Sequence, residues 1–378
     1  MKDKQHVDVS AIVLAPVNEG LPPQQRLESS LRLSDLMTKM ATHVICHVIV
    51  DYEELLAEER FSVASAFLER VTSTHLCNHK LTKEGIVLRY KGEAFQLHEE
   101  YKTMTLTRSV YEHLVMFYFL FSHPKTDEER SVVWNYWKIN SKKNLMEASS
   151  PSPQQPHSPT PSPSPEGRGV GAVKASPSGG GGCGQAFPSG GGGWGPIEVL
   201  RKEIFSTRLG MECYQKLDEW TAPDKPTQNG AIAFFRKRAD NGQSSMVNGQ
   251  SSTANGQSSM VNGQSSMVNG QCYDVRRVSY NQAWRYLFGK GQEDMDQLYR
   301  HLSIHSHPIY DGLMQYQDQA QKDEGFDGVP LYLSSCFLAY LCRLFLRLLP
   351  QGERMFDGEF SEDEIQVFKA LSRITALP

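Results

Sequence analysis

The chain has 378 residues, and its 39 lysines and arginines nearly balance its 43 aspartates and glutamates, which leaves a formal net charge of -4. Such a balance gives no overall electrostatic footprint for nucleic acid or for an anionic membrane surface. The first residues lack the apolar segment of a secretory signal, and the 7 cysteines include no C-x-x-C pair. The sequence therefore predicts a cytoplasmic protein with reduced thiols.

Two low-complexity stretches interrupt the chain. Residues 147–195 are almost entirely Ser, Pro and Gly, and residues 241–271 repeat the motif NGQSSMV. The repeat cannot form a coiled coil, because its two apolar residues are adjacent in each unit. Neither stretch offers an apolar face, so both are predicted to be disordered insertions. The remaining 300 or so residues suffice for one large domain or two closely packed halves.

The N-terminal half of the core is predicted over residues 1–146. Apolar residues recur at helical spacing in Leu27–Met40, in His43–Val50 and again in Tyr52–Leu76. Lys83–Gly92 is a short break, where Ile86–Leu88 could form a strand. These segments predict helices that pack through one apolar face.

The longest helix of this half is predicted over Glu93–Phe121, with an apolar stripe in steps of three and four residues. It should end before Pro124, because the residue that precedes a proline avoids the helical conformation. A capping-box pattern at Thr126–Glu129 predicts the start of the next helix. We expect the first of these helices to be the central one of the fold.

The second half contributes further helices. Pro196 should begin a helix that runs to Trp220, within a helical segment over residues 196–240. Residues 272–378 should form the C-terminal half of the same core, in four helices that the sequence places at Tyr280–Phe288, Glu293–Ser306, Val329–Leu349 and from Ser361 onwards. Strand-like alternation is almost absent. The fold class predicted is all-α, a single helical bundle interrupted by the two insertions.

Val329–Leu349 is apolar enough to raise the question of a membrane span. Its uncharged part ends at Cys342, because Arg343 follows, and is about 14 residues long where a span needs about 20. No membrane span is therefore predicted. We expect a buried core helix, with an interfacial helix as the alternative.

Histidine and cysteine side chains form two groups on predicted helices. The groups are His43, Cys46 and His47, followed by His75, Cys77 and His79. Two such groups could close a tetrahedral zinc site, although their spacing matches no standard zinc module. The alternative is histidines that are hydrogen-bonded within the core. The sequence predicts no metal and no cofactor.

Arg108 and Glu112 stand four residues apart on the apolar stripe of the predicted central helix. That spacing allows an ion pair. A charge removed from water must be paired or hydrogen-bonded, so the pair either fixes the packing of the helix or forms the polar floor of a site. If it is buried, Arg108→Ala should cost roughly 3 to 5 kcal/mol.

Ser303 and His307 form a second pair with the same spacing, just before Pro308. A histidine at a helix C-terminus has its protonated form favoured by the helix dipole. A serine and a histidine alone are weak evidence for nucleophilic catalysis. Because Arg108 needs more acceptors than one carboxylate supplies, we expect these two polar pairs to meet.

Two motifs together resemble a bacterial family of helical proteins, the domain of unknown function 5677. They are R-x-x-x-E before an apolar stretch, here RSVYEHLVMFYFLF, and Y-x-x-x-S-x-x-x-H-P, here YRHLSIHSHP. The resemblance covers about Met37 to Leu349 without the insertions. It implies a polar core formed by Arg108, Glu112, Ser303 and His307. The family itself has no settled activity.

A looser resemblance is to HEPN ribonucleases, helical proteins with an R-x(4–6)-H motif, which Arg108 and His113 satisfy in spacing. The polar residue usual after that arginine is a serine here. Arg108 and His113 also point about 140° apart around a helix. This resemblance implies a metal-independent ribonuclease with a defence or toxin role.

The function predicted first is a cytoplasmic helical binding or interaction module of unknown ligand, with the ribonuclease as the alternative. The candidate site residues are Arg108, Glu112, Ser303 and His307. The two functions differ in one geometric respect. A ribonuclease needs Arg108 and His113 in one open cleft, whereas a binding module pairs Arg108 with Glu112. The partner is unknown, and a homodimer is one candidate.

Overall fold

The computed structural model of the chain describes residues 8–97, 100–149, 195–222, 225, 231–237, 273–287, 297, 299–300, 302–303 and 328–373. Helices make up most of these residues, and strands are confined to two hairpins. The predicted all-α class is therefore confirmed in its main feature. The chain divides into two compact units, of which unit 1 comprises Met1–Trp134 with Asn229–Pro378 and unit 2 comprises Asn135–Gln228. Most of each predicted insertion lies outside the described residues.

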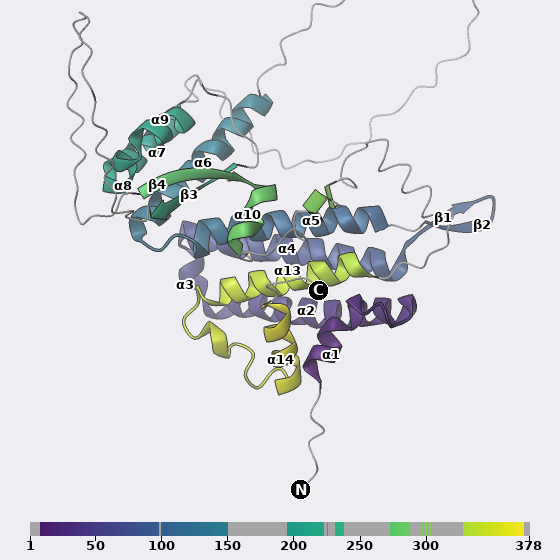
Figure 1. Cartoon of the computed structure of the whole chain (residues 1–378). Helices are drawn as coiled ribbons and strands as arrows, with labels where there is room; N and C mark the ends of the chain where they lie inside the picture. The colour runs from purple at the N-terminus through teal and green to yellow at the C-terminus, as the bar shows by residue number, and fades with distance from the viewer. Residues whose placement is uncertain are drawn as a thin grey trace, which may run out of the picture. The chain divides into compact units, whose positions relative to one another are not determined.

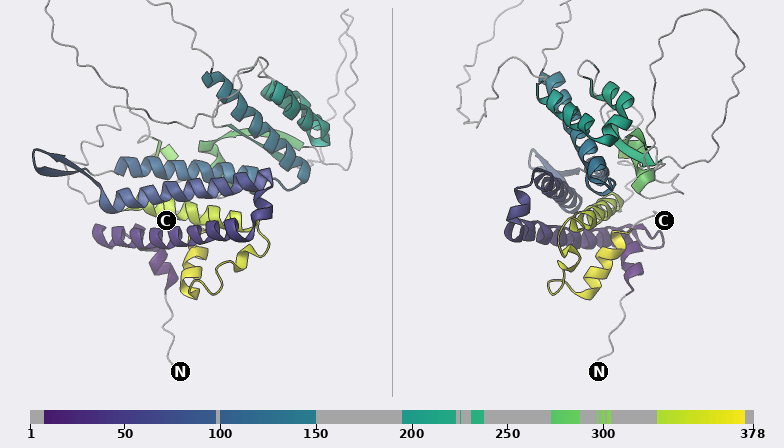
Figure 2. Two further views of the ribbon diagram at one scale, coloured as in Figure 1. Left: turned by 180° about the vertical axis from the view of Figure 1, so that it is seen from behind. Right: turned by 90° about the vertical axis from the view of Figure 1, so that its left-hand side faces the viewer.

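Four long helices form the body of unit 1. They are α2 (Pro23–Asp51), α4 (Glu59–Glu84), α5 (Glu100–Phe117) and α13 (Val329–Leu346). They lie side by side, and α13 packs against all three of the others (Figures 1 and 2). One hydrophobic core thus contains residues from both ends of the sequence, from Val13 to Leu371.

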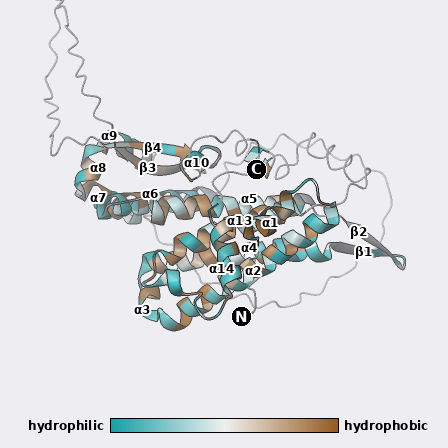
Figure 3. Cartoon of the chain, turned by 60° about the horizontal axis from the view of Figure 1, so that its bottom comes forward, coloured by the Kyte–Doolittle hydropathy of each residue, from teal (hydrophilic) through white to brown (hydrophobic). Residues whose placement is uncertain are grey.

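The most enclosed helix is α13 rather than the predicted central helix. All but three of its residues are buried, including every residue from Pro330 to Ala339. Among the described residues it is the one helix long and apolar enough to cross a membrane, and 83% of it is buried inside the protein. The other long helices alternate between hydrophilic and hydrophobic residues (Figure 3). The expectation of a buried core helix is confirmed.

Shorter elements surround the bundle. They are α1 (Val9–Leu14), η1 (Ala15–Val17), α3 (Glu53–Leu56), the π-helical turn η2 (Tyr118–Ser122), the start of α6 (Asp127–Ser149), α10 (Tyr280–Leu287), η3 (Gly352–Arg354) and α14 (Glu362–Leu371). Capping boxes form at the starts of α6 and α14, the first of them as predicted. The Thr126 hydroxyl accepts from the Glu129 amide at 3.1 Å, and that of Ser361 accepts from the Glu364 amide at 3.3 Å. In each case the glutamate carboxylate accepts in return from the amide of the cap residue.

The prediction that a helix begins at Glu93 was wrong. Ile86–Tyr90 (β1) and Glu93–Leu97 (β2) form an antiparallel hairpin, in which Tyr90 faces Glu93. Both residues of the two-residue turn have positive φ, 51° at Lys91 and 87° at Gly92. This left-handed turn matches the twist of paired strands, so the helix starts only at Glu100.

A second hairpin corrects the helical assignments around the repeat. Ala231–Lys237 (β3) pairs antiparallel with Tyr273–Ser279 (β4), from Ala231 opposite Ser279 to Lys237 opposite Tyr273. The seven-residue repeat therefore lies in sequence between two paired strands. Phe234 and Val278 are buried in the core of unit 1, which supplies the apolar contacts that a short hairpin needs.

Unit 2 contains the later part of α6 together with α7 (Gly195–Ser206), α8 (Arg208–Glu212) and α9 (Tyr214–Thr221). The single helix predicted to run to Trp220 was wrong. Thr207 leaves the helical conformation and caps α8 by accepting from the Gly210 amide at 2.9 Å. A threonine in that role is a common start signal, and it divides the segment.

Candidate functional site

Helix α5 presents Arg108 and Glu112 one turn apart on the same face. The Arg108 Nε donates to Glu112 Oε1 at 2.8 Å, so the predicted ion pair forms. The two side chains are 19% and 28% exposed. The pair is thus partly buried, and water still reaches it.

Tyr299 joins this pair from the second half of the chain. Its hydroxyl lies 3.5 Å from the Arg108 Nη2 and 3.4 Å from Glu112 Oε1. The guanidinium carbon stands 5.5 Å from the centre of the tyrosine ring, within the range of a cation–π contact. We call Arg108, Glu112 and Tyr299 the polar centre.

Two more tyrosines border the polar centre. The rings of Tyr111 and Tyr299 have centroids 5.5 Å apart, and the buried Tyr111 donates its hydroxyl to the Tyr280 carbonyl at 3.1 Å. Burial, together with the nearby Glu112 and Tyr299, raises the pKa of Tyr280 to about 12. The Tyr280 phenol is therefore a neutral hydrogen-bonding group at physiological pH.

Electrostatics keep Arg108 ionised. Burial alone would lower the pKa of Arg108, but the hydrogen bond and charge of Glu112 raise it overall. Burial raises the pKa of Tyr299, although Arg108 opposes this shift. Arg108 therefore keeps its positive charge, and Tyr299 stays a protonated phenol that can donate and accept a hydrogen bond.

The other two candidate residues fare differently. Ser303 belongs to the short described helical stretch with Tyr299, and its hydroxyl donates to the Tyr299 carbonyl at 2.6 Å. That hydroxyl thus bonds to its own helix. His307 lies outside the described residues, so its approach to Arg108 stays a prediction.

His113, which the ribonuclease alternative requires, has other neighbours. Its Nδ1 bonds to the Ser109 carbonyl at 2.7 Å, and its ring packs edge-on against Phe67 of α4. Burial lowers its pKa. Arg108 instead contacts Glu112 and Tyr299, so the two side chains have different hydrogen-bond partners.

Sequence reasoning missed Tyr299 as the third member of the centre. The residue is the first letter of the motif YRHLSIHSHP, so the signal was present. Ser303 and His307 were expected to supply the further hydrogen-bond partners of Arg108 and Glu112, but a phenol takes that place. The phenol can donate and accept at once, which suits the space between a guanidinium and a carboxylate.

The six histidines and cysteines do not converge on a metal site, because no group of three metal-binding side chains occurs among the described residues. His43 Nε2 bonds to the Met355 carbonyl at 3.0 Å, and His47 Nδ1 pairs with Asp51. Cys46 and Cys77 are exposed. The two histidines therefore form hydrogen bonds within the protein.

His75 and His79 belong to a buried hydrogen-bonded chain between α2, α4 and α13. His75 lies fully buried, with Nε2 at 2.9 Å from the Ser34 Oγ and Nδ1 at 2.8 Å from the Ser334 Oγ. His79 Nδ1 is 3.0 Å from the same Ser34 Oγ, and its Nε2 is 3.3 Å from Asp35. Desolvation lowers the pKa of His75 to about 3, so its ring is neutral.

Arg108→Ala should destabilise the protein by about 1 to 2 kcal/mol, because Glu112 loses its cation but stays partly solvated. This is less than a fully buried pair would cost. The double change Arg108→Met with Glu112→Leu removes both charges and should be milder than the single change. Urea unfolding of the three proteins measures the difference. A double variant less stable than Arg108→Ala would contradict the argument.

Comparison with known proteins adds no relative. No family model, no curated protein and no solved structure matches the chain. The two family resemblances drawn from short motifs therefore stay predictions.

Proposed function

We propose that this chain is a cytoplasmic helical binding or interaction module whose polar centre makes the recognition contacts. The observation that carries the proposal is the partial exposure of the ion pair, 19% for Arg108 and 28% for Glu112. A charged donor and a charged acceptor stand side by side and remain within reach of a ligand. Because water still reaches both side chains, a ligand group can take the place of that water.

The centre is also held in place before a ligand arrives. Tyr299 bridges the two charges from a different part of the chain, and its ring stacks near Tyr111. Preorganised groups lose little entropy on binding. The planar fork of an arginine suits a planar partner. We therefore expect a ligand group that combines an acceptor with a donor, such as a primary amide.

The experiment follows the Nε–Hε NMR signals of ¹⁵N-labelled arginines during titration with small probes at millimolar concentration. The probes are acetamide, which donates and accepts hydrogen bonds, acetate, which only accepts, and guanidinium, which only donates. Arg201 provides an internal control in unit 2, because its side chain is 16% exposed and pairs with Asp218 through Nη2, which leaves its Nε buried. The Arg108 signal, assigned with Arg108→Lys, should shift while that of Arg201 stays. Glu112→Gln should weaken the response.

Equal shifts of both arginines, or none, would reduce the centre to a structural ion pair. A second arm tests the ribonuclease alternative by incubation with single-stranded RNA. We expect no cleavage that depends on Arg108. Cleavage abolished separately by Arg108→Lys and by His113→Ala, in variants that melt normally, would replace the binding proposal.

A further inference from the structure

A second polar site lies in unit 1, away from the polar centre. It is a pocket of about 280 Å³ between the C-terminal end of α13, the turn around η3 and the C-terminal end of α14. This volume is just below the roughly 300 Å³ at which pockets for drug-sized ligands begin. The pocket therefore suits a small molecule.

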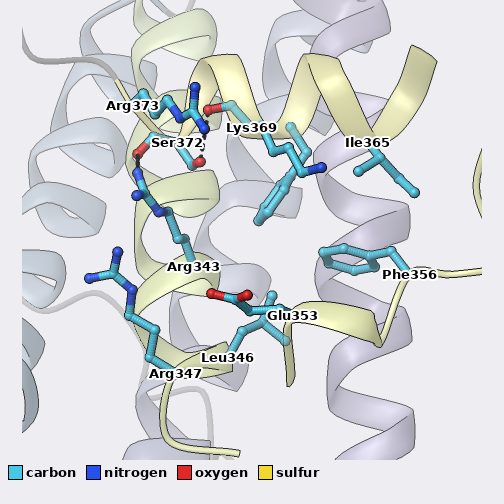
Figure 4. A pocket seen from close by; sticks show the side chains of 10 residues that line it. Arg343, Leu346, Arg347, Glu353, Phe356, Ile365, Lys369, Ser372 and Arg373 are labelled. Atoms are coloured by element: carbon cyan, nitrogen blue, oxygen red, sulfur yellow. Dashed lines mark hydrogen bonds between the residues drawn. The ribbon is translucent and has the colours of Figure 1, made fainter. Parts of the chain in front are cut away.

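The walls of the pocket differ in character. The guanidinium groups of Arg343, Arg347 and Arg373 gather on one side, and Phe356 and Ile365 face them from the other (Figure 4). Two further buried apolar side chains, Leu346 and Phe368, complete the floor, and Lys369 adds a fourth cation. One side thus offers positive charge, and the other offers apolar surface.

The positive charge exceeds its local compensation. Glu353 is the one carboxylate in the lining, and none of the four cations forms an ion pair with a described residue. Arg343 donates to the Ser372 carbonyl at 3.2 Å. The positive charges of Arg347 and Arg373 add to burial in lowering the pKa of Arg343.

A simpler account is that cations gather where helices end, because a helix C-terminus carries about half a negative charge. Two helices, α13 and α14, end here. Together they supply about one negative charge, and Glu353 supplies another. Roughly two positive charges remain uncompensated, so the helix ends explain only part of the cluster.

We infer that this pocket binds a small free amphipathic oxyanion, a phosphate or carboxylate group attached to an apolar ring or short chain. The arginines would bind the oxyanion, since the guanidinium matches its geometry with paired hydrogen bonds. The apolar body would cover Leu346, Phe356 and Phe368. The site is independent of the polar centre, so either proposal can fail alone.

Isothermal titration calorimetry of the full chain tests the inference with four probes, which carry the oxyanion, the apolar ring or both. Phenyl phosphate and benzoate should bind, inorganic phosphate should bind at least about tenfold more weakly, and phenol should not bind measurably. Raising the salt concentration should lower the affinity for phenyl phosphate, because the contacts are ionic. Equal affinity for phenyl phosphate and inorganic phosphate, or for phenyl phosphate and phenol, would overturn the inference.

Matched variants locate the binding. Arg347→Gln and Arg373→Gln change exposed side chains and should each weaken phenyl phosphate by about tenfold. Arg354→Gln removes the same charge from a neighbouring residue outside the lining and should leave affinity unchanged. An equal loss of affinity in all three variants would overturn the inference, because it would show a general attraction of the anion to positive charge rather than binding in the pocket. Vesicles that contain phosphatidic acid form the last arm, and binding to them without binding to free phenyl phosphate would also overturn the inference.

Discussion

Lowering the pH below 6.5 should destabilise unit 1 by roughly 1.4 kcal/mol per pH unit through His75 alone. Burial lowers the pKa of this histidine from 6.5 to about 3 in the folded protein. Above pH 6.5 the ring is neutral in both states, and stability is complete. Between pH 6.5 and 3 only the unfolded chain takes up the proton, so the loss should approach about 4 to 5 kcal/mol.

His75→Gln isolates this effect, because glutamine still forms hydrogen bonds but does not titrate. Burial also lowers the pKa of His79, His113 and His123, so both proteins should weaken in acid. The free energy of unfolding should fall more steeply with decreasing pH in the wild type than in His75→Gln. The difference between the two slopes should correspond to one bound proton, about 1.4 kcal/mol per pH unit. Both proteins are unfolded in urea at several pH values, and a pulse of hydrogen exchange at one fixed pH reports how much of α4 is unfolded. The slope of the unfolding free energy against pH then follows for each protein. Identical slopes would show that His75 titrates normally.

Phe345→Ala should destabilise unit 1 by about 3 to 5 kcal/mol and leave unit 2 unchanged. Phe345 is fully buried in α13, and its ring lies 5.6 Å from that of Phe61 and 6.3 Å from that of Phe117. Its removal opens a cavity where α4, α5 and α13 meet, and the neighbours can close it only in part. Differential scanning calorimetry should show one transition moved to lower temperature and one unmoved.

Phe205→Ala is the matched control, since the same substitution then falls in unit 2. Phe205 is only partly buried and packs on Tyr214 with ring centroids 4.7 Å apart, so its loss should cost less and move the other transition. If Phe345→Ala lowers both transitions together, the two compact units unfold as one cooperative structure.

Periodicity predicted the long helices because each buries one broad face. The stretches from Leu27 to Val50 and from Tyr52 to Leu76 became α2 and α4, and the apolar segment after Val329 became α13. The hairpins were missed for a physical reason. Their strands are five and seven residues long, and a short apolar run cannot be distinguished from a helix by periodicity alone. The turn at Lys91 and Gly92 carried the missing information.

The candidate site was predictable where the interaction is local. Arg108 and Glu112 lie one turn apart, and an i, i+4 spacing is enough to predict their pairing. The approach of Tyr299 depends on how the chain returns to α5 after both insertions, which no local pattern encodes. The basic pocket was missed likewise, because Arg343, Glu353 and Arg373 meet only after the chain turns between α13 and α14.

The buried chain of His75 has a direction, and a surface group sets it. Asp35 can only accept, so His79 presents its Nε2 proton to Asp35 and leaves Nδ1 bare. Ser34 must then donate to His79 and accept from His75 Nε2. That leaves His75 Nδ1 as the acceptor for the Ser334 hydroxyl. The exposed Asp35 carboxylate on α2 thus selects the tautomers of His79 and His75. It also sets the direction of four successive hydrogen bonds, of which the last is donated by Ser334 of α13.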